Sequence, residues 1–596
     1  MQRVREVLPR LMASARQRWP LILICATGVV ANVVWLVRHR RGLPFDIDEA
    51  GYLERALADG RALSHGGVTG FFSHLHTPDQ QAPLLPALAG ILHATTGVGP
   101  VGMMGVQEVF YVLLVCGGWN IGGRLGGRAL AIVAAIGIAA LPGLLDASRG
   151  FGFAPVASGT FAVALVLLLA CGSFDSPGRC VAWGLSLGVA ALARTMVLGL
   201  LPGLLLAAAV RLVAVGISWR RVRNVVGAVA LGFLTAWAWY SASWHLVFSY
   251  LRDYGYGSHA AEYGEHRPWF SIARWTYRFD VLAHDDLYLP LVAGLFVAIG
   301  AAVLVSTRRV VIRHRAADGG AGPHRSAAGW RGLLATDSSS VAIVGVFGYI
   351  ALTSTKNRGS FFELPITMPL VVMVLALVWR VSRVRWLTGG AIVLASMFTF
   401  AEKTDLVPGP ALSTVVLGRT TVPVVSSAGA LVGAARGSLE LPQTDDDAQF
   451  VAELRAFGAF TATASRVILK RVGADGRDPA ILFATQDAWF NPNSVGLDLF
   501  LLSGRPVSIG QFLPAPATPS DAARLLGDPA HGLFNIVITA PRAPQLGPEY
   551  TIVPDPAVAE AGLRDDGFID FARLTAPDGR VVTLWFKAGR GPLAPR

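Results

Sequence analysis

Charged residues are scarce in this sequence of 596 residues, because Asp, Glu, Lys and Arg together make up only 15% of it. Soluble globular chains are usually nearer a quarter charged. Here 53% of the residues are hydrophobic and the mean hydropathy is +0.50. Apolar stretches of roughly 15–20 residues, each about long enough to cross the hydrocarbon core as a helix, recur from Trp19 to Phe400 and then stop. The composition therefore excludes an ordinary soluble protein and predicts a polytopic membrane protein.

Cysteine is also rare, and the long C-terminal region has none. The four cysteines lie in or beside apolar segments, so nothing indicates a disulfide framework or a cysteine-based zinc site: Cys25, Cys116, Cys171 and Cys180. A nucleotide-binding glycine fingerprint is likewise absent from the sequence. The formal net charge is +12, but the arginines sit mainly in short loops between apolar stretches. We therefore expect them to orient the chain in a membrane and not to bind nucleic acid.

The apolar stretches predict about eleven membrane spans: 19–37, 101–119, 129–145, 154–171, 181–197, 199–217, 225–245, 287–305, 339–353, 363–379 and 386–400. With an arginine-rich N-terminus in the cytoplasm, every loop that falls on the cytoplasmic side is basic, as the positive-inside rule requires. A cleavable signal peptide has small residues at the end of its apolar run, but here the run ends in "WLVRHRR". We therefore expect the first span to be retained. The segment 82–97 is short and carries two prolines, and we expect it to lie in the interface.

Two regions follow from this topology in a cytoplasmic (inner) membrane. Residues 1–400 are expected to form a transmembrane domain, in which 38–100 is the first extracytoplasmic loop, and 401–596 an extracytoplasmic α/β domain. In the second region "PAILFAT", "FNIVITA" and "RVVTLWFKA" are typical of strands, and "SDAARLLG" is typical of a helix. The stretch around 404–440 is rich in proline and glycine and is expected to be a linker.

The stretch "FDIDEAGYLERAL", residues 45–57, gathers four carboxylates just after the first span. Asp46, followed three residues later by Glu49, predicts an Asp version of the capping box at a helix start. The apolar stripe of that helix is expected to be Ala50, Leu53, Ala56 and Leu57. Glu54 and Asp59 are expected to face water.

The run Asp48-Glu49-Ala50-Gly51-Tyr52 resembles the first extracytoplasmic loop of the GT-C superfamily of membrane glycosyltransferases. The likeness is greatest to the bacterial branch with protein O-mannosyltransferases and aminoarabinose transferases. The segment "HTPDQQAPLLPALAGILHATTGVG" is similar to the proline-rich element that follows in these families. Three later segments add to the resemblance: "GRLGGRALAIVAAIGIAALPGLLDASRGF", "GVAALARTMVLGLLPGLLLA" and "FIDFARLTAPDGRVVTLWFK".

The resemblance implies an inverting transfer of a hexose or pentose from a polyprenyl-phosphate donor to an extracytoplasmic hydroxyl. Asp48 would be the general base, and Glu49 would orient the acceptor or Asp48 itself. The departing lipid phosphate needs cations, for which Lys356 and Arg358 are the first candidates, the 38–41 arginines the second, and Arg194 and Arg149 the remaining ones. No cofactor other than the lipid-linked donor is implied.

The loop 249–290 is dense in aromatic residues that either stack on sugar rings or mark the membrane interface. We name as candidate substrate-binding residues Tyr256, Tyr263 and Trp269 from this loop, with Tyr52 and His76 from the first loop. The spacing of His259, Glu262, Glu265 and His266 matches no strong metal signature, so no metal site is predicted.

Two other classes of function stay open. A transporter or flippase of lipid-linked glycans would suit the many spans and the intramembrane Glu108 and Arg194. A non-catalytic assembly protein is the third reading.

For a glycosyltransferase, the acceptor is expected to be a protein, a lipid or a glycan of the cell envelope. Trp489 in "ATQDAWFNPNS" is expected to be exposed and is a candidate contact for the acceptor. Membrane lipids are the remaining partners expected.

Overall fold

The computed structural model describes residues 2–257, 260, 267–297, 299–300, 328–357, 361–381, 385–404, 413–417, 420–425, 447–485, 487, 489–511, 518–527, 534–541 and 555–591. Contacts divide the chain into two compact units. The membrane unit comprises Met1–Val37, Phe72–Ala87 and Met104–Ala430, and the C-terminal unit comprises Arg38–Phe71, Leu88–Met103 and Leu431–Arg596. The C-terminal unit therefore includes most of the predicted first extracytoplasmic loop.

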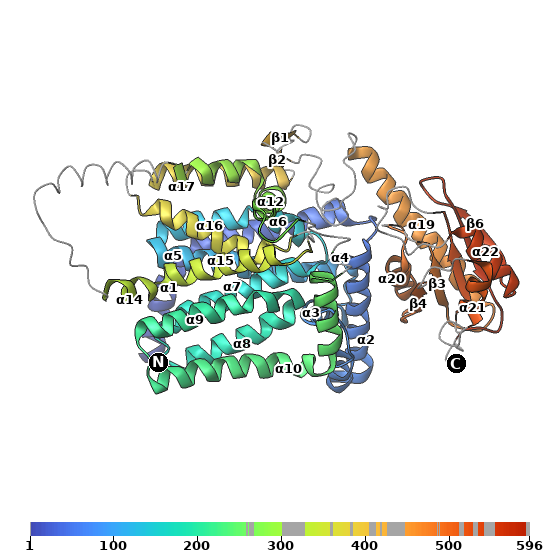
Figure 1. The fold of residues 1–596 in the computed structure, drawn as a ribbon, viewed down its shortest axis with the longest axis horizontal. Helices are drawn as coiled ribbons and strands as arrows, with labels where there is room; N and C mark the ends of the chain where they lie inside the picture. The colour runs from blue at the N-terminus through green and yellow to red at the C-terminus, as the bar shows by residue number, and fades with distance from the viewer. Residues whose placement is uncertain are drawn as a thin grey trace, which may run out of the picture. The chain divides into compact units, whose positions relative to one another are not determined.

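Helices make up nearly all of the membrane unit (Figure 1). The longer ones are α1 (Gln2–Trp35), α5 (Gln107–Ala139), α7 (Phe153–Cys171), α8 (Pro177–Ala193), α9 (Leu201–Val215), α10 (Trp219–Gly255), α15 (Asp337–Ser354), α16 (Leu364–Trp379) and α17 (Arg385–Lys403). The shorter ones are α6 (Pro142–Ser148), α12 (Ile272–Val281) and α14 (Ala328–Leu334), with the turns η2 (Met104–Val106), η3 (Thr195–Gly199) and η4 (Leu282–Leu287). Turn η1 (Leu36–Arg40) follows α1.

α5 is a helical hairpin, because its chain reverses at Gly126 and Gly127. Gly127 has φ 77° and ψ −172°, a conformation that essentially only glycine adopts. The two arms pack closely, and the Tyr111 hydroxyl donates to the Ala139 carbonyl oxygen at 2.8 Å. The hairpin matches two of the predicted spans, 101–119 and 129–145.

Six helices among the described residues are long and apolar enough to cross a membrane: Arg18–Arg40, Pro100–Ala139, Phe153–Cys171, Thr195–Val215, Trp219–Gly255 and Asp337–Ser354. Four shorter apolar helices are Leu84–Thr96, Pro177–Ala193, Tyr288–Val297 and Leu364–Trp379. All but the first of these four coincide with predicted spans. At 1.5 Å per residue, the 17 residues of α8 and the 16 of α16 reach about 25 Å, slightly less than the hydrocarbon thickness. The chain is a polytopic α-helical membrane protein.

The C-terminal unit is built on a five-stranded sheet with the order β4-β3-β5-β7-β6. Its strands are β3 (Ala480–Ala484), β4 (Ser508–Gln511), β5 (Ile536–Thr539), β6 (Ile569–Thr575) and β7 (Val581–Phe586). β3 is parallel to β4 and β5, while β7 is antiparallel to β5 and β6. β3, β5, β7 and the helix at 519–527 confirm the elements predicted from sequence.

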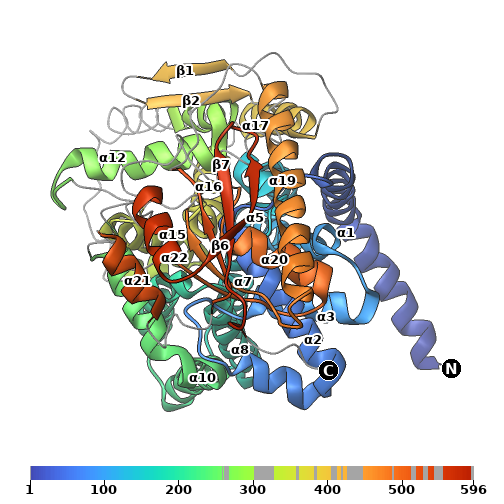
Figure 2. The ribbon, with the colours of Figure 1, turned by 90° about the vertical axis from the view of Figure 1, so that its right-hand side faces the viewer.

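Helices cover both faces of this sheet: α19 (Asp447–Gly473), α20 (Pro492–Ser503), α21 (Pro519–Gly527) and α22 (Pro556–Asp565). Leu482 and Val537 pack with Leu563 of α22 on one face. On the other face Phe460 of α19 contacts Phe490, which contacts Phe483 of β3. Figure 2 shows α21 and α22 on one side of β6 and β7 and α19 on the other.

Three further helices follow the first span: α2 (Ile47–Leu75), α3 (Leu84–Thr96) and α4 (Pro100–Met103). α2 is kinked at Gly67, and the chain passes from the C-terminal unit to the membrane unit after Phe71. Within the predicted linker, β1 (Ser413–Leu417) and β2 (Thr420–Val425) pair as an antiparallel ribbon. The remainder of 405–446 lies outside the described residues.

Candidate functional site

The first turn of α2 is closed by a capping box. The Asp46 carboxylate accepts from the backbone N–H groups of Asp48 and Glu49, both at 2.8 Å. In return the Glu49 carboxylate accepts from the Asp46 N–H at 3.3 Å. Both acids are buried. The capping role predicted for Asp46 is confirmed, and the backbone that carries Asp48 is fixed by three hydrogen bonds.

Glu49 has a second partner, since its carboxylate forms an ion pair with Arg40. Arg40 also donates to the Pro44 carbonyl oxygen at 2.8 Å, and its guanidinium lies 4.9 Å from the centre of the Phe45 ring. Glu49 therefore ties the loop before α2 to the first turn of the helix. Arg40 faces protein, which leaves Arg38 and Arg41 as the more exposed members of the 38–41 cluster.

Asp48 differs from both neighbours because its side chain is exposed. It sits at the positive end of α2, where the helix dipole favours the ionised carboxylate. An ionised, accessible carboxylate on a rigid backbone can accept a proton from a hydroxyl that approaches from solvent. Of the three acids of this turn, Asp46 and Glu49 are therefore buried and Asp48 is exposed to solvent.

α20 holds the start of α2 from the side. The Asn493 amide donates to the Ile47 carbonyl oxygen at 2.6 Å, one residue before Asp48. A Cβ at Gly51 would lie 2.9 Å from that same amide nitrogen, so glycine at this position allows α20 to approach α2 closely. Further along, the Glu54 carboxylate lies against Gly496, and Arg61 donates to the Gly504 carbonyl oxygen.

The apolar stripe predicted for α2 is confirmed, since all four of its members are buried: Ala50, Leu53, Ala56 and Leu57. The expectation that Glu54 and Asp59 face water is wrong. Glu54 is half-buried, and burial raises its pKa to about 7. Asp59 is fully buried where α2 crosses the segment with Gly90. Helix α2 is covered on more than one face, so Glu54 and Asp59 are enclosed as well.

The predicted donor-binding cations belong to the membrane unit. Arg194 ends α8, and its guanidinium lies 4.2 Å from the centre of the Phe362 ring. Lys356 is half-buried in the loop after α15, where its backbone N–H donates to the Gly255 carbonyl oxygen at 2.8 Å. Arg358 lies outside the described residues. Lys356 thus lies within the segment that connects α15 to α16, and Arg194 contacts the same segment at Phe362.

Two arginines of α12 bind the main chain of this connecting segment. Arg274 donates to the carbonyl oxygens of Thr353, Ser354 and Thr355 at 2.9–3.1 Å. Arg278 donates to the carbonyl oxygens of Leu352 and Asn357 at 2.8 and 3.2 Å and forms an ion pair with Glu363. Both arginines are buried and also satisfy the last carbonyls of α15. The main chain on either side of Lys356 is therefore fixed.

The predicted sugar-binding residues fall in different surroundings. Tyr52 is half-buried on α2, and His76 is exposed with Nδ1 at 3.1 Å from the Ala238 carbonyl oxygen. The hydroxyl of the exposed Tyr256 lies 3.3 Å from that of Ser354. Trp269 contacts the Trp275 ring edge-on at 5.3 Å. Tyr263 lies outside the described residues.

Sequence reasoning missed a buried ionic cluster in the membrane unit. Lys403, at the end of α17, donates to the Asp146 carboxylate at 2.7 Å and to the Tyr288 hydroxyl at 2.9 Å, and its side chain is fully buried. Nearby, Arg149 lies 4.6 Å from the centre of the Trp35 ring. The charged run "FAEKTD" at the end of an apolar segment was a sign in the sequence that Lys403 is unusual. The sequence could not show its partner, because Asp146 is 257 positions earlier in the chain.

Two further expectations have structural outcomes. Trp489, expected to be exposed, is buried. Its backbone N–H donates to the Asp487 carboxylate at 2.8 Å, and that acid pairs with the half-buried Arg580. Among the described residues no three His, Cys, Asp or Glu side chains are grouped so that they could hold a metal ion. The segment 261–266, with most of the acidic and histidine run of that loop, lies outside them.

The fold of a helical membrane unit followed by an α/β region at the C-terminus is shared, over nearly the whole chain, by two solved structures of ArnT from Cupriavidus metallidurans. The apo structure has a TM-score of 0.52 at 13% identity, covering 96% of this chain and 98% of ArnT. The structure bound to undecaprenyl phosphate has a TM-score of 0.52 at 14% identity, covering 96% and 99%.

A third similar structure is an oligosaccharyltransferase from Archaeoglobus fulgidus in complex with Zn and sulfate. Its TM-score is 0.41 at 11% identity, with 86% of this chain and 67% of the other covered. No family model and no curated protein matches the sequence. At these identities the comparison with ArnT establishes the fold.

Proposed function

We propose that the protein is an integral membrane glycosyltransferase that moves a sugar from a polyprenyl-phosphate donor to an extracytoplasmic acceptor hydroxyl. The observation that carries the proposal is the exposed Asp48 on the fixed first turn of α2, beside two acids that are both buried. The ArnT fold supports the donor class, because one of the two ArnT structures is bound to undecaprenyl phosphate.

In the proposed reaction Asp48 takes the proton of the acceptor hydroxyl as its oxygen attacks the anomeric carbon. The bond between that carbon and the donor phosphate oxygen breaks, and its electron pair leaves with the lipid phosphate. Attack from the face opposite the phosphate inverts the configuration. Developing charge on the phosphate requires cations, for which Lys356, Arg358 and Arg194 are proposed. The sugar transferred is a hexose or a pentose, and no metal is assigned a step.

The proposed orientation places the N-terminus in the cytoplasm and the C-terminal unit on the outer face of the cytoplasmic membrane. Its support is the basic character of the loops that fall on the inner side. With this orientation the first turn of α2 is extracytoplasmic, on the same side as the acceptor. The acceptor is a protein, a lipid or an envelope glycan.

The test measures sugar transfer in membranes that contain the wild-type protein, Asp48→Asn or Glu453→Gln at matched expression. A panel of polyprenyl-phosphate sugars serves as donors, and both donor consumption and glycan product are followed. Loss of a general base typically costs about 10²–10⁴-fold in rate, so Asp48→Asn should consume donor at least a hundredfold more slowly. Glu453 is an exposed acid of the same unit, and its replacement should leave the rate unchanged.

The second candidate function, a flippase of lipid-linked glycans, is favoured by the buried Glu108 within the Pro100–Ala139 span, 3.4 Å from the Asn32 amide. Transbilayer movement of a fluorescent polyprenyl-phosphate sugar in proteoliposomes, without donor consumption, would support this candidate. Equal donor consumption by wild type and Asp48→Asn would overturn the general-base assignment.

A further inference from the structure

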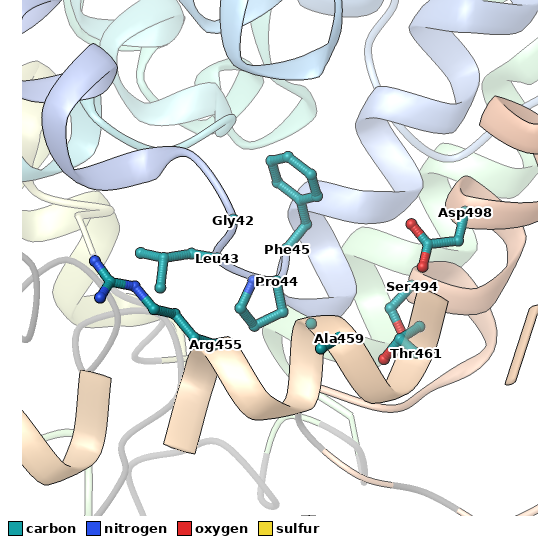
Figure 3. Close-up of a pocket in the computed structure, with 10 residues that line it drawn as sticks. Gly42, Leu43, Pro44, Phe45, Arg455, Ala459, Thr461, Ser494 and Asp498 are labelled. Atoms are coloured by element: carbon teal, nitrogen blue, oxygen red, sulfur yellow. The ribbon is translucent and has the colours of Figure 1, made fainter. Parts of the chain in front are cut away.

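A pocket of about 320 Å³ lies within the C-terminal unit, directly beside the loop that leads into α2. Figure 3 shows its walls: the loop before α2 on one side and the helices α19 and α20 on the other. Its lining residues are Gly42, Leu43, Pro44, Phe45, Arg455, Gly458, Ala459, Thr461, Ser494 and Asp498. Its volume is at the small end of the range for small-molecule sites and is sufficient for a single sugar ring.

One wall of the pocket is polar. Asp498 is half-buried, and within the described part of the chain Arg466 acts on its carboxylate electrostatically without a hydrogen bond or close ion pair. Burial raises the pKa of Asp498 to about 6, so the carboxylate is mostly ionised at neutral pH. The buried Thr461 and Ser494 hydroxyls donate to the carbonyl oxygens of Phe457 and Asn491. The Ser494 oxygen also accepts from the Asn491 N–H at 3.0 Å, so one lone pair remains on Ser494 and two remain on Thr461 to accept from a ligand.

The opposite wall is apolar. Leu43 and Pro44 are buried, and the half-buried Phe45 adds an aromatic ring. Gly458 brings α19 against this loop, because a Cβ there would lie 3.3 Å from the Gly42 carbonyl oxygen. Arg455, which is exposed, places a donor at the rim. A ligand that fits has an apolar face and several hydroxyl groups at its edge.

The pocket is physically continuous with the turn that carries Asp48. Phe45 directly precedes the Asp46 cap, so the apolar wall and the helix start share one short segment. On the polar side, Asn493 holds the Ile47 carbonyl oxygen, and the next residue, Ser494, lines the pocket. Both walls are therefore anchored to the first turn of α2.

We propose that this pocket binds a sugar ring of the acceptor, with its hydroxyls on Asp498, Thr461 and Ser494 and its C–H face on Pro44 and Phe45. A sugar offers hydroxyl donors for a carboxylate and a flat apolar face for an aromatic ring, which an anion or an alkyl chain does not combine. The proposal rests on the proposed function, since it makes the acceptor a glycan and places it next to Asp48. An anionic acceptor group is disfavoured at the Asp498 wall.

The test uses the full-length protein in lipid nanodiscs and saturation-transfer NMR, with methyl α-mannopyranoside, methyl β-galactopyranoside and methyl α-arabinofuranoside as separate probes. At least one glycoside should bind the wild type. Binding should weaken at least fivefold in Asp498→Ala, in which the hydroxyl acceptor is lost. It should weaken equally in Ala459→Phe, in which a ring fills the pocket from the exposed face of α19.

Glu453→Gln, on α19 but outside the pocket lining, is the matched control and should bind like wild type, and melting temperatures verify that all variants fold. The proposal is overturned if none of the three glycosides binds the wild-type protein. It is also overturned if Asp498→Ala and Ala459→Phe both bind a glycoside as tightly as the wild type does. Preferential binding of ethanolamine, a simple ammonium probe for the carboxylate, also overturns it. Asp48→Asn should bind the glycosides like the wild type. Failure of the pocket proposal can therefore be distinguished from failure of the proposed sugar transfer.

Discussion

Arg278 of α12 and Glu363, the residue before α16, form a buried ion pair across 85 positions of sequence. Arg278 is 3% exposed and Glu363 is fully buried. The pair closes the segment between α15 and α16, which contains the candidate donor cations Lys356 and Arg358. Its position makes the geometry of that segment depend on a helix some 80 residues earlier in the chain.

Replacement of Arg278 by Gln should destabilise the membrane unit strongly. Removal of one partner of a buried pair leaves the other charge uncompensated and typically costs about 3–5 kcal/mol. Thermal unfolding in nanodiscs measures the effect. Arg252→Gln is the matched control, since Arg252 pairs with Asp253 on the surface and such pairs contribute at most about 1 kcal/mol. Equal melting temperatures for the two variants would refute the structural role of the pair.

Asp46→Ala should loosen the first turn of α2 and reduce turnover without touching Asp48. Loss of an N-cap acceptor costs about 0.5–2 kcal/mol, and here two backbone N–H groups lose their partner. Hydrogen exchange at residues 46–50 should rise in Asp46→Ala and less in Asp46→Asn, which retains an amide oxygen. Unchanged exchange in Asp46→Ala would show that Glu49 and Asn493 suffice to hold the turn.

Glu54 should give the stability of the C-terminal unit a pH dependence. Its pKa rises from 4.5 to about 7 on burial, so the folded state binds more protons than the unfolded state between these values. This contribution is fully present below about pH 4.5 and is lost as the pH rises through about 7. Between pH 6 and 8 the midpoint of chemical denaturation should fall for wild type and fall less for Glu54→Gln. Identical pH profiles would exclude Glu54 as the cause.

Gly60→Ala should be destabilising even though alanine favours helices. A Cβ at Gly60 would lie 2.8 Å from the Gly90 carbonyl oxygen, which is main chain and cannot move aside cheaply. Overpacking of this kind costs about 1–3 kcal/mol. Gly66→Ala in the same helix meets nothing within 4 Å and should gain up to about 1 kcal/mol. Opposite signs of the two changes in unfolding free energy are the expected result.

The features predicted correctly from sequence are those that depend on local pattern. The capping box needs only Asp46 and Glu49 three residues apart, and strands such as β3 and β5 show in short apolar runs. The GT-C resemblance likewise came from residues in one loop and a few later segments.

The features missed depend on contacts between distant residues. Glu54 and Asp59 carry no local sign of burial, because the residues that enclose α2 come from α20 and from the segment around Gly90. Lys403 and Asp146 pair across 257 positions, and Asp487, which fixes the backbone of the buried Trp489, pairs with Arg580 from 93 positions later. Single-sequence periodicity reports the orientation of a helix toward a core and does not identify its neighbours.

The docking of α2 on α20 determines where the gene can be divided for domain exchange. A chimaera joined at residue 400 would replace Asn493 and Gly496 while retaining the Ile47, Gly51 and Glu54 positions that fit them. Grafts between relatives should therefore transfer 38–71 and 88–103 together with everything after 430. The C-terminal unit would then be transferred as three separate pieces of sequence that fold into one body.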